Sequence, residues 1–189
     1  MGIYAVAYKL TYAFQFLPLA FVAALYPAMS AMVGKDREGL SRLFTDATKY
    51  MILLVTPIVF GIWAVADPLI QFTVGAEFLS SILPLQVLIF VLLFLFLDFP
   101  IGSLLNAADR QVLKTILMGL TMVINVIANL VLVPKMGALG AAIAANISFA
   151  FLLISGAVFV PQFVDLEWKR LAWYIGRVLV VGVLMAWLV

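Results

Sequence analysis

Long apolar runs, separated by short segments that carry charges, proline or glycine, follow one another along the whole chain. A helix needs about 20 apolar residues to cross the hydrocarbon core of a bilayer, and each run reaches about that length. Because the strands of a membrane barrel alternate apolar and polar residues over about ten positions, continuous runs exclude a barrel. The pattern predicts an all-α membrane protein that forms a single transmembrane helical bundle. The six predicted spans are residues 3–33, 47–66, 81–107, 112–133, 139–160 and 171–189.

The first connection, residues 34–50, carries charges of both signs among apolar residues. This pattern is typical of a short amphipathic helix that lies on the cytoplasmic membrane surface. A solvated connector between the first two spans would have the same composition, so both interpretations stay open.

Lysine and arginine gather in alternate connections between the predicted spans. Eight lie after the first, third and fifth spans, against one, Lys135, in the intervening connections. Because cytoplasmic loops carry an excess of Lys and Arg, we expect these three connections to face the cytoplasm and the chain to start outside. The predicted location is the cell inner (cytoplasmic) membrane. The eight cations are Lys35, Arg37, Arg42, Lys49, Arg110, Lys114, Lys169 and Arg170.

Composition narrows the function classes. Of 189 residues, 67% are hydrophobic and 11% are charged, whereas a soluble domain carries about 25% charged residues. The chain has no His and no Cys, which excludes thiolate or imidazole metal sites, a Ser-His-Asp triad and disulfides. Most enzyme chemistries are thereby excluded, and we expect no cofactor and no metal site. The net charge is +2, but the scattered cations form no run that could follow nucleic acid.

Two features favour a chain cut from a longer protein. The predicted outside N-terminus has no signal peptide, and the sixth span stops without a polar flank. The alternative is a complete small membrane protein.

The first predicted span carries a polar stripe. At about 100° per residue, its members fall within one arc of about 100°, and Lys9 lies beside them. We interpret this half-amphipathic helix as the wall of a cavity. The alternative is an aromatic belt with a snorkelling lysine near the outer surface. The stripe consists of Tyr4, Tyr8, Thr11, Tyr12 and Gln15.

Other polar residues lie inside later spans. Asn125 and Asn129 are four residues apart on the fourth span, and we favour interhelical hydrogen bonds over substrate contact for both. Small residues at Gly140, Ala144 and Ser148 predict close approach of a neighbouring helix.

Asp98 lies well inside the third span, where a carboxylate needs a cation, a proton or a bound ion. Arg177 enters the sixth span from the same side, so an Asp98–Arg177 pair is geometrically possible. A structural pair is the favoured interpretation, and a site for H⁺ or Na⁺ coupling is the alternative.

Five prolines lie within spans and predict bent helices, which suit a carrier that rearranges around a cavity. They are Pro18, Pro27, Pro57, Pro84 and Pro100.

Several segments resemble one known family. Residues 2–10 (GIYAVAYKL) and 25–30 (LYPAMS) resemble the start of the second half of polysaccharide-biosynthesis flippases, members of the multidrug/oligosaccharidyl-lipid/polysaccharide exporter superfamily. Residues 125–144 are similar to the family's most recognisable segment, and residues 67–70 and 75–78 also fit. The resemblance implies a two-lobed exporter, of which these six spans form part of the second lobe and the N-terminal lobe is missing.

The resemblance also implies a function, namely translocation of an undecaprenyl-diphosphate-linked oligosaccharide by alternating access, as in polysaccharide, lipopolysaccharide or O-antigen export. Lys9 would then attract the diphosphate. Tyr4, Tyr8, Tyr12 and Gln15 would contact the sugar, and Asp98 would be an ion-coupling candidate. No residue would be catalytic, and the partners would be the lipid-linked oligosaccharide and membrane lipids.

Three alternatives remain open at this point. A multidrug cation antiporter of the same superfamily would need an acidic cavity, against which Lys9 argues. An accessory membrane subunit would suit a six-span chain. A lipid-modifying enzyme is disfavoured because His and a carboxylate cluster are lacking.

Overall fold

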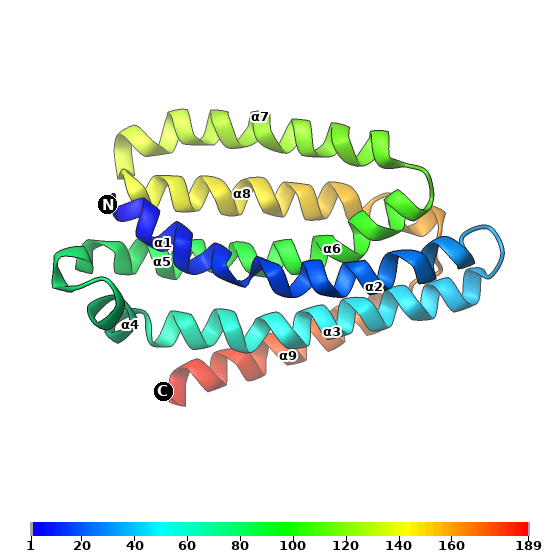
Figure 1. Cartoon of the computed structure of the whole chain (residues 1–189), viewed down its shortest axis with the longest axis horizontal. Helices are drawn as coiled ribbons and strands as arrows, with labels where there is room; N and C mark the ends of the chain where they lie inside the picture. The colour runs from blue at the N-terminus through cyan, green and yellow to red at the C-terminus, as the bar shows by residue number, and fades with distance from the viewer. Residues whose placement is uncertain (1, 189) are drawn as a thin grey trace.

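The computed structural model describes residues 2–188, and this part of the chain is helical, with no strand. Figure 1 shows the long helices side by side along one axis, joined at the two ends of a bundle. The helices are α1 (Ile3–Tyr12), η1 (Ala13–Gln15), α2 (Phe16–Met32), α3 (Arg37–Ala64), α4 (Ala66–Thr73), η2 (Ala76–Ser81), α5 (Ile82–Leu88), α6 (Val91–Ala107), α7 (Gln111–Met136), α8 (Ala138–Ala157), η3 (Val160–Gln162) and α9 (Trp168–Leu188).

Six helical units in residues 2–188 are long and apolar enough to cross a membrane, which confirms the predicted all-α multi-pass fold. Val189, the predicted end of the last span, lies outside the described residues. The units are Ile3–Met32, Arg37–Ala64, Ala76–Ala107, Gln111–Met136, Ala138–Gln162 and Trp168–Leu188.

The prediction of a separate surface segment at residues 34–50 was wrong. From Arg37 onward this segment is the first half of the continuous helix α3. Asp36 caps the helix by accepting a hydrogen bond from the Gly39 amide at 2.8 Å, which satisfies one of the free N–H groups of the first turn. The buried side chains Leu40 and Phe44 continue the core-facing stripe of the apolar half, so nothing breaks the helix.

The connections α2–α3, α6–α7 and α8–α9 meet at one end of the bundle, on the right in Figure 1. We call this the cationic end, because it carries Lys35, Arg37, Arg110, Lys169 and Arg170. The turn between α7 and α8, the α4–η2 segment and the starts of α1 and α5 lie at the opposite end. This is the arrangement that the alternating charge pattern requires; which end faces the cytoplasm stays a prediction.

The core is built around α6, which packs against α2, α3 and α8. Its side chains Leu92, Phe96 and Leu104 are fully buried. By contrast, α7 packs mainly on α8 and α9 mainly on α3. These two outer helices therefore present most of their apolar side chains outward, as lipid-facing helices do.

The first span is not a regular helix. A 3₁₀ turn at Ala13–Gln15 separates α1 from α2. Pro18 follows directly, and its ring cannot coexist with a regular helical hydrogen bond to the carbonyl of residue 14. The proline therefore accounts for the bend that it predicts in this span.

Close packing of α7 on α8 depends on a missing side chain. A Cβ atom at Gly140 would overlap the backbone carbonyl of Leu132. Ala144 and Ser148, on the same ridge of α8, are buried as well. The predicted small-residue contact is thus confirmed, and α7 is its partner helix.

We expect Gly140→Ala to destabilise the bundle by about 1–3 kcal/mol, because the added methyl group forces the two backbones apart. Gly119→Ala on α7 is the matched control, since a Cβ atom there meets nothing within 4 Å. Helix propensity makes that control neutral or stabilising by up to about 1 kcal/mol. Reversible unfolding in mixed micelles, followed by circular dichroism, measures both, and equal effects would contradict the close-contact interpretation.

Candidate functional site

Three tyrosines on α1 form a ladder of aromatic rings. They recur every fourth residue, so that each ring lies over the next on one helix face. The ring centroids of Tyr4 and Tyr8 are 6.2 Å apart, and those of Tyr8 and Tyr12 are stacked at 4.3 Å. Tyr8 is 46% exposed, whereas Tyr4 and Tyr12 are half-buried against the core at the opposite end. The ladder offers one continuous aromatic surface.

The remaining members of the stripe differ in exposure. Lys9 is exposed and adjoins Tyr8, and Gln15 is partly buried in η1. Thr11 faces inward, because it is fully buried, and its hydroxyl has no hydrogen-bond partner within residues 2–188. The structure therefore exposes Tyr8 and Lys9, packs Tyr4 and Tyr12 partly against the core, and turns Thr11 inward.

The start of α1 is held by the η2 segment. The Ser81 hydroxyl donates a hydrogen bond to the Ile3 carbonyl at 3.0 Å, and Ala7 is buried among residues of α4, α5, α6 and α8. These contacts fix the inner side of α1, so that Tyr8 stays exposed.

Of the two asparagines of α7, Asn125 makes the interhelical hydrogen bond favoured from the sequence, whereas Asn129 bonds within its own helix. Asn125 donates to the Ser148 hydroxyl at 3.1 Å, and Asn129 donates to the Asn125 side chain at 2.9 Å. Both amides also line a shallow recess of about 380 Å³ next to Pro134. Contact of either residue with a substrate stays a prediction.

The predicted Asp98–Arg177 pair was wrong. The Lys114 ammonium group contacts both carboxylate oxygens of Asp98, at 2.7 and 2.6 Å. The two side chains are 13% and 11% exposed, so the pair lies inside the bundle. Arg177 instead stands over the ring of Trp173, 4.5 Å from its centroid. The physical reason is the helix arrangement, since α9 packs mainly on α3 and not on α6.

Two glycines border the ion pair between α6, α7 and α8. A Cβ atom at Gly102 would lie 3.4 Å from Lys114 Cε, and one at Gly156 would lie 3.7 Å from an Asp98 oxygen. Sequence reasoning counted Lys114 as a loop cation and missed this role. The available signal was Gly102, which lies four residues after Asp98 and on the same helix face.

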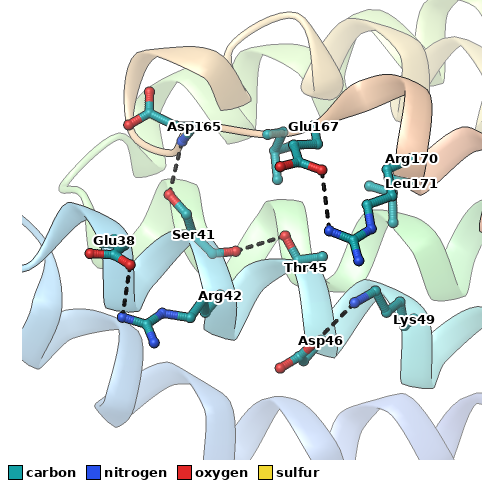
Figure 2. Close-up of a pocket in the computed structure, with 11 residues that line it drawn as sticks. Glu38, Ser41, Arg42, Thr45, Asp46, Lys49, Asp165, Glu167, Arg170 and Leu171 are labelled. Carbon is teal, nitrogen blue, oxygen red and sulfur yellow. Dashed lines mark hydrogen bonds and ion pairs between the residues drawn. The ribbon is translucent and has the colours of Figure 1, made fainter.

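Charged side chains also line a recess of about 360 Å³ at the cationic end (Figure 2). Each cation there pairs with a carboxylate of its own segment: Arg42 with Glu38 at 3.1 Å, Lys49 with Asp46 at 3.2 Å and Arg170 with Glu167 at 3.4 Å. These charges compensate one another, so the recess carries no strong net field.

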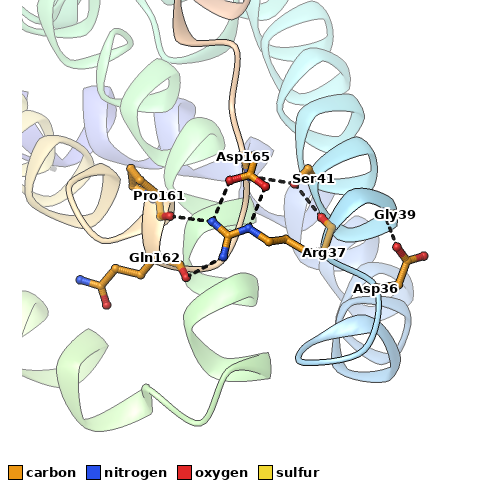
Figure 3. Close-up of polar contacts among 7 residues, drawn as sticks. All are labelled: Asp36, Arg37, Gly39, Ser41, Pro161, Gln162 and Asp165. Atoms are coloured by element: carbon orange, nitrogen blue, oxygen red, sulfur yellow. Dashed lines mark hydrogen bonds and ion pairs between the residues drawn. The ribbon is translucent and has the colours of Figure 1, made fainter.

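A clamp joins the start of α3 to the segment before α9 (Figure 3). The Arg37 guanidinium donates two hydrogen bonds of 2.8 Å to Asp165 and one of 3.2 Å to the Pro161 carbonyl. Ser41 accepts a hydrogen bond from the Asp165 amide at 2.9 Å. The Arg37 hydrogen bonds hold the pKa of Asp165 below its ordinary 3.8. The clamp therefore contributes its full stability at pH values above the ordinary pKa of Asp165. This contribution is lost as the pH falls through the lowered pKa.

Comparison with known proteins identifies two relatives and one family model. Residues 1–83 match a family model described as polysaccharide biosynthesis protein. The chain is 24% identical, over 97% of its length, to a probable low-salt glycan biosynthesis flippase from Haloferax volcanii. It is 25% identical, over 85% of its length, to an uncharacterized membrane protein from Methanocaldococcus jannaschii. It spans 40% and 32% of these relatives, and no solved structure matches it.

Removing one partner of the Asp98–Lys114 pair leaves an uncompensated buried charge. We expect Lys114→Met and Asp98→Leu each to destabilise the bundle by about 3 kcal/mol or more, whereas the double variant recovers most of the loss. Arg42→Met, at an exposed pair, is the control and costs less than about 1 kcal/mol. Unfolding in mixed micelles measures all four. Additive losses in the double variant would show that the two charges are not coupled.

Proposed function

We propose, on the premise of the polysaccharide-biosynthesis and flippase family that these matches support, that the chain works as part of a membrane flippase or exporter. The observation that carries the proposal is the aromatic ladder of α1 with the exposed Lys9 beside it, inside a bundle of six apolar spans. The family-model match covers α1 itself. The task is transport, with no covalent step.

The proposed substrate is an undecaprenyl-diphosphate-linked oligosaccharide, which moves by alternating access while its lipid tail stays in the bilayer. Aromatic rings present flat apolar faces on which the C–H faces of sugars pack. The ladder of Tyr4, Tyr8 and Tyr12, with Gln15, would hold the sugar. Lys9 would attract the diphosphate as a point charge. Asn125 and Asn129 are further candidates, because their amides line an open recess.

A transport pathway of this kind needs a second wall. The chain spans 40% of the Haloferax relative, and the first span leaves Tyr8 and Lys9 exposed. We propose that an N-terminal lobe covers this span and closes the cavity. The bend at Ala13–Gln15 gives α1 a point about which it can rearrange. The proposed setting is the cell inner membrane, with the cationic end in the cytoplasm.

Two other functions compete with this proposal. An accessory membrane subunit would also use the weakly buried first span, but as a docking face for another bundle. A multidrug cation antiporter would need an acidic wall, and the exposed cation Lys9 beside the ladder opposes it.

We expect Lys9→Glu to reduce transfer of a labelled lipid-linked oligosaccharide into vesicles about tenfold or more, the loss for a charge-assisted contact of ~1.5–3 kcal/mol. Lys135→Glu is the matched control, because Lys135 is also exposed and precedes the α7–α8 turn, which lies at the same end of the bundle as the start of α1. Both variants are made in the protein as the cell produces it, at equal abundance. Normal transfer by Lys9→Glu would refute the proposed role of Lys9. If deletion of the whole chain left transfer unaffected, the accessory-subunit function would be favoured.

Asp98 is the proposed coupling site for H⁺ or Na⁺, with Lys114 as the charge that an incoming ion replaces. Arg177 is not part of this proposed site, because its guanidinium lies over the ring of Trp173 and Asp98 pairs with Lys114. If Asp98 carries the ion, Asp98→Asn in a Lys114→Met background removes the dependence of transfer on a pH or Na⁺ gradient. Lys114→Met alone should keep it. An unchanged gradient dependence in the double variant leaves Asp98 with a structural role alone.

A further inference from the structure

Arg177 lies on α9 between two tryptophans, at a depth in the bilayer where an arginine needs an anionic partner. Trp168 and Trp187 are about 28 Å apart along α9 at 1.5 Å per residue, close to the ~30 Å thickness of the hydrocarbon core. Tryptophans mark the two membrane interfaces. Arg177 is about 13 Å along the helix from Trp168. Its backbone therefore lies at the depth of lipid tails and not of headgroups.

The side chain of Arg177 points away from the rest of the bundle. The buried residues of α9, Leu171 and Gly182, define the face that packs on α3. At 100° per residue, Trp173 and Arg177 lie on the opposite face. Trp173 is 63% exposed, and Arg177 is exposed as well. No carboxylate within residues 2–188 forms an ion pair with Arg177.

The guanidinium is turned toward the cationic end. It stands 4.5 Å from the centroid of the Trp173 ring, one helical turn nearer that end. Side chains of a helix tilt toward its N-terminus, which for α9 is the cationic end. Arg177 therefore snorkels along the indole toward the headgroup region, and the ring holds it by a cation–π contact.

Two further cations share this face. Lys169, Arg170, Trp173 and Arg177 fall within an arc of about 100°. One carboxylate, Glu167, lies against this group, 3.4 Å from Arg170. Glu167 compensates Arg170, and no carboxylate within residues 2–188 forms an ion pair with Lys169 or Arg177, so this face keeps an excess of positive charge. The other residues of the face, among them Val180, Leu184 and Trp187, are apolar or aromatic and exposed, as lipid-facing residues are.

We propose that Lys169, Arg170 and Arg177, with Trp173 beneath them, bind the phosphate of an anionic phospholipid at the cationic end of α9. The guanidinium of Arg177 reaches the phosphate from below, and the two cations at the start of the helix hold it from the side. Trp173 orients Arg177 and packs against the upper part of the acyl chains. This lipid contact is separate from the substrate surface of α1, and it stands whether or not the chain is part of a flippase.

The test places a reporter at the site. Trp63, Trp168 and Trp187 are replaced by Phe, so that Trp173 alone fluoresces, and the chain is reconstituted in phosphatidylcholine vesicles. Brominated phosphatidylglycerol is then compared with brominated phosphatidylcholine as a quencher. We expect phosphatidylglycerol to be preferred about fivefold or more, the factor for one basic residue at an anionic surface. Arg177→Gln should remove most of this preference, and Arg177→Lys should keep part of it.

Two controls locate the effect. Arg110→Gln removes an exposed cation from the α6–α7 connection at the same end and should leave the preference unchanged. A chain that keeps only Trp187, on the same face of α9 at the other end, should show no preference. Three results would each overturn the proposal. They are equal quenching by both lipids, a preference that survives Arg177→Gln, and a Trp173 that neither lipid reaches because a protein partner covers it.

A second measurement needs no tryptophan substitutions. Native mass spectrometry of the unaltered chain, released from nanodiscs that contain both lipids, should show retained phosphatidylglycerol in excess of phosphatidylcholine. Arg177→Gln should lower this excess, and Arg110→Gln should not. Retention without headgroup preference in the unaltered chain would also overturn the proposal, whatever the fold of the variants.

Discussion

The whole fold depends on one constraint: no water reaches the interior of the bilayer to satisfy polar groups. Backbone amides and carbonyls must pair within their own helix, and polar side chains must find partners inside the bundle. Thr48 and Thr56 therefore donate to carbonyls one turn back, at 2.9 and 2.6 Å. Asn146 donates to the Val87 carbonyl across the gap between α8 and α5, at 2.8 Å. The Asp98–Lys114 pair is the most demanding case, because both groups are charged.

Satisfying these groups requires close backbones, and glycine provides them. Gly140 lets α7 approach α8, and Gly182 lets α9 approach Thr56 and Phe60 of α3. Gly102 and Gly156 border the Asp98–Lys114 pair. In a membrane, where lipid tails are as apolar as leucine, such contacts replace the hydrophobic effect as the cause of helix association. The same residues thus hold the bundle together and shelter its internal charges.

Local sequence features predicted the elements but not their neighbours. The number of spans followed from the length of the apolar runs, and the bend at Pro18 and the close contact at Gly140 followed from their residue types. The start of α3 was missed because the cap at Asp36 and the buried Leu40 and Phe44 form a weaker signal than the charges around them. The partner of Asp98 depends on which helix lies beside α6, and that is decided by packing between distant segments. The aromatic ladder followed from spacing alone, but the inward turn of Thr11 required knowledge of what α1 packs against.

The attachment of α9 has a consequence for the order in which the protein assembles. Its main neighbour is α3, and the clamp that seats it joins Arg37 to Asp165, which are 128 positions apart. Contacts between such distant segments form late, after the nearer ones. The surface of α3 that receives Gly182 must therefore face lipid throughout synthesis of the three spans between α3 and α9. Newly made chains thus pass through a stage in which this surface of α3 is open to any other helix in the bilayer.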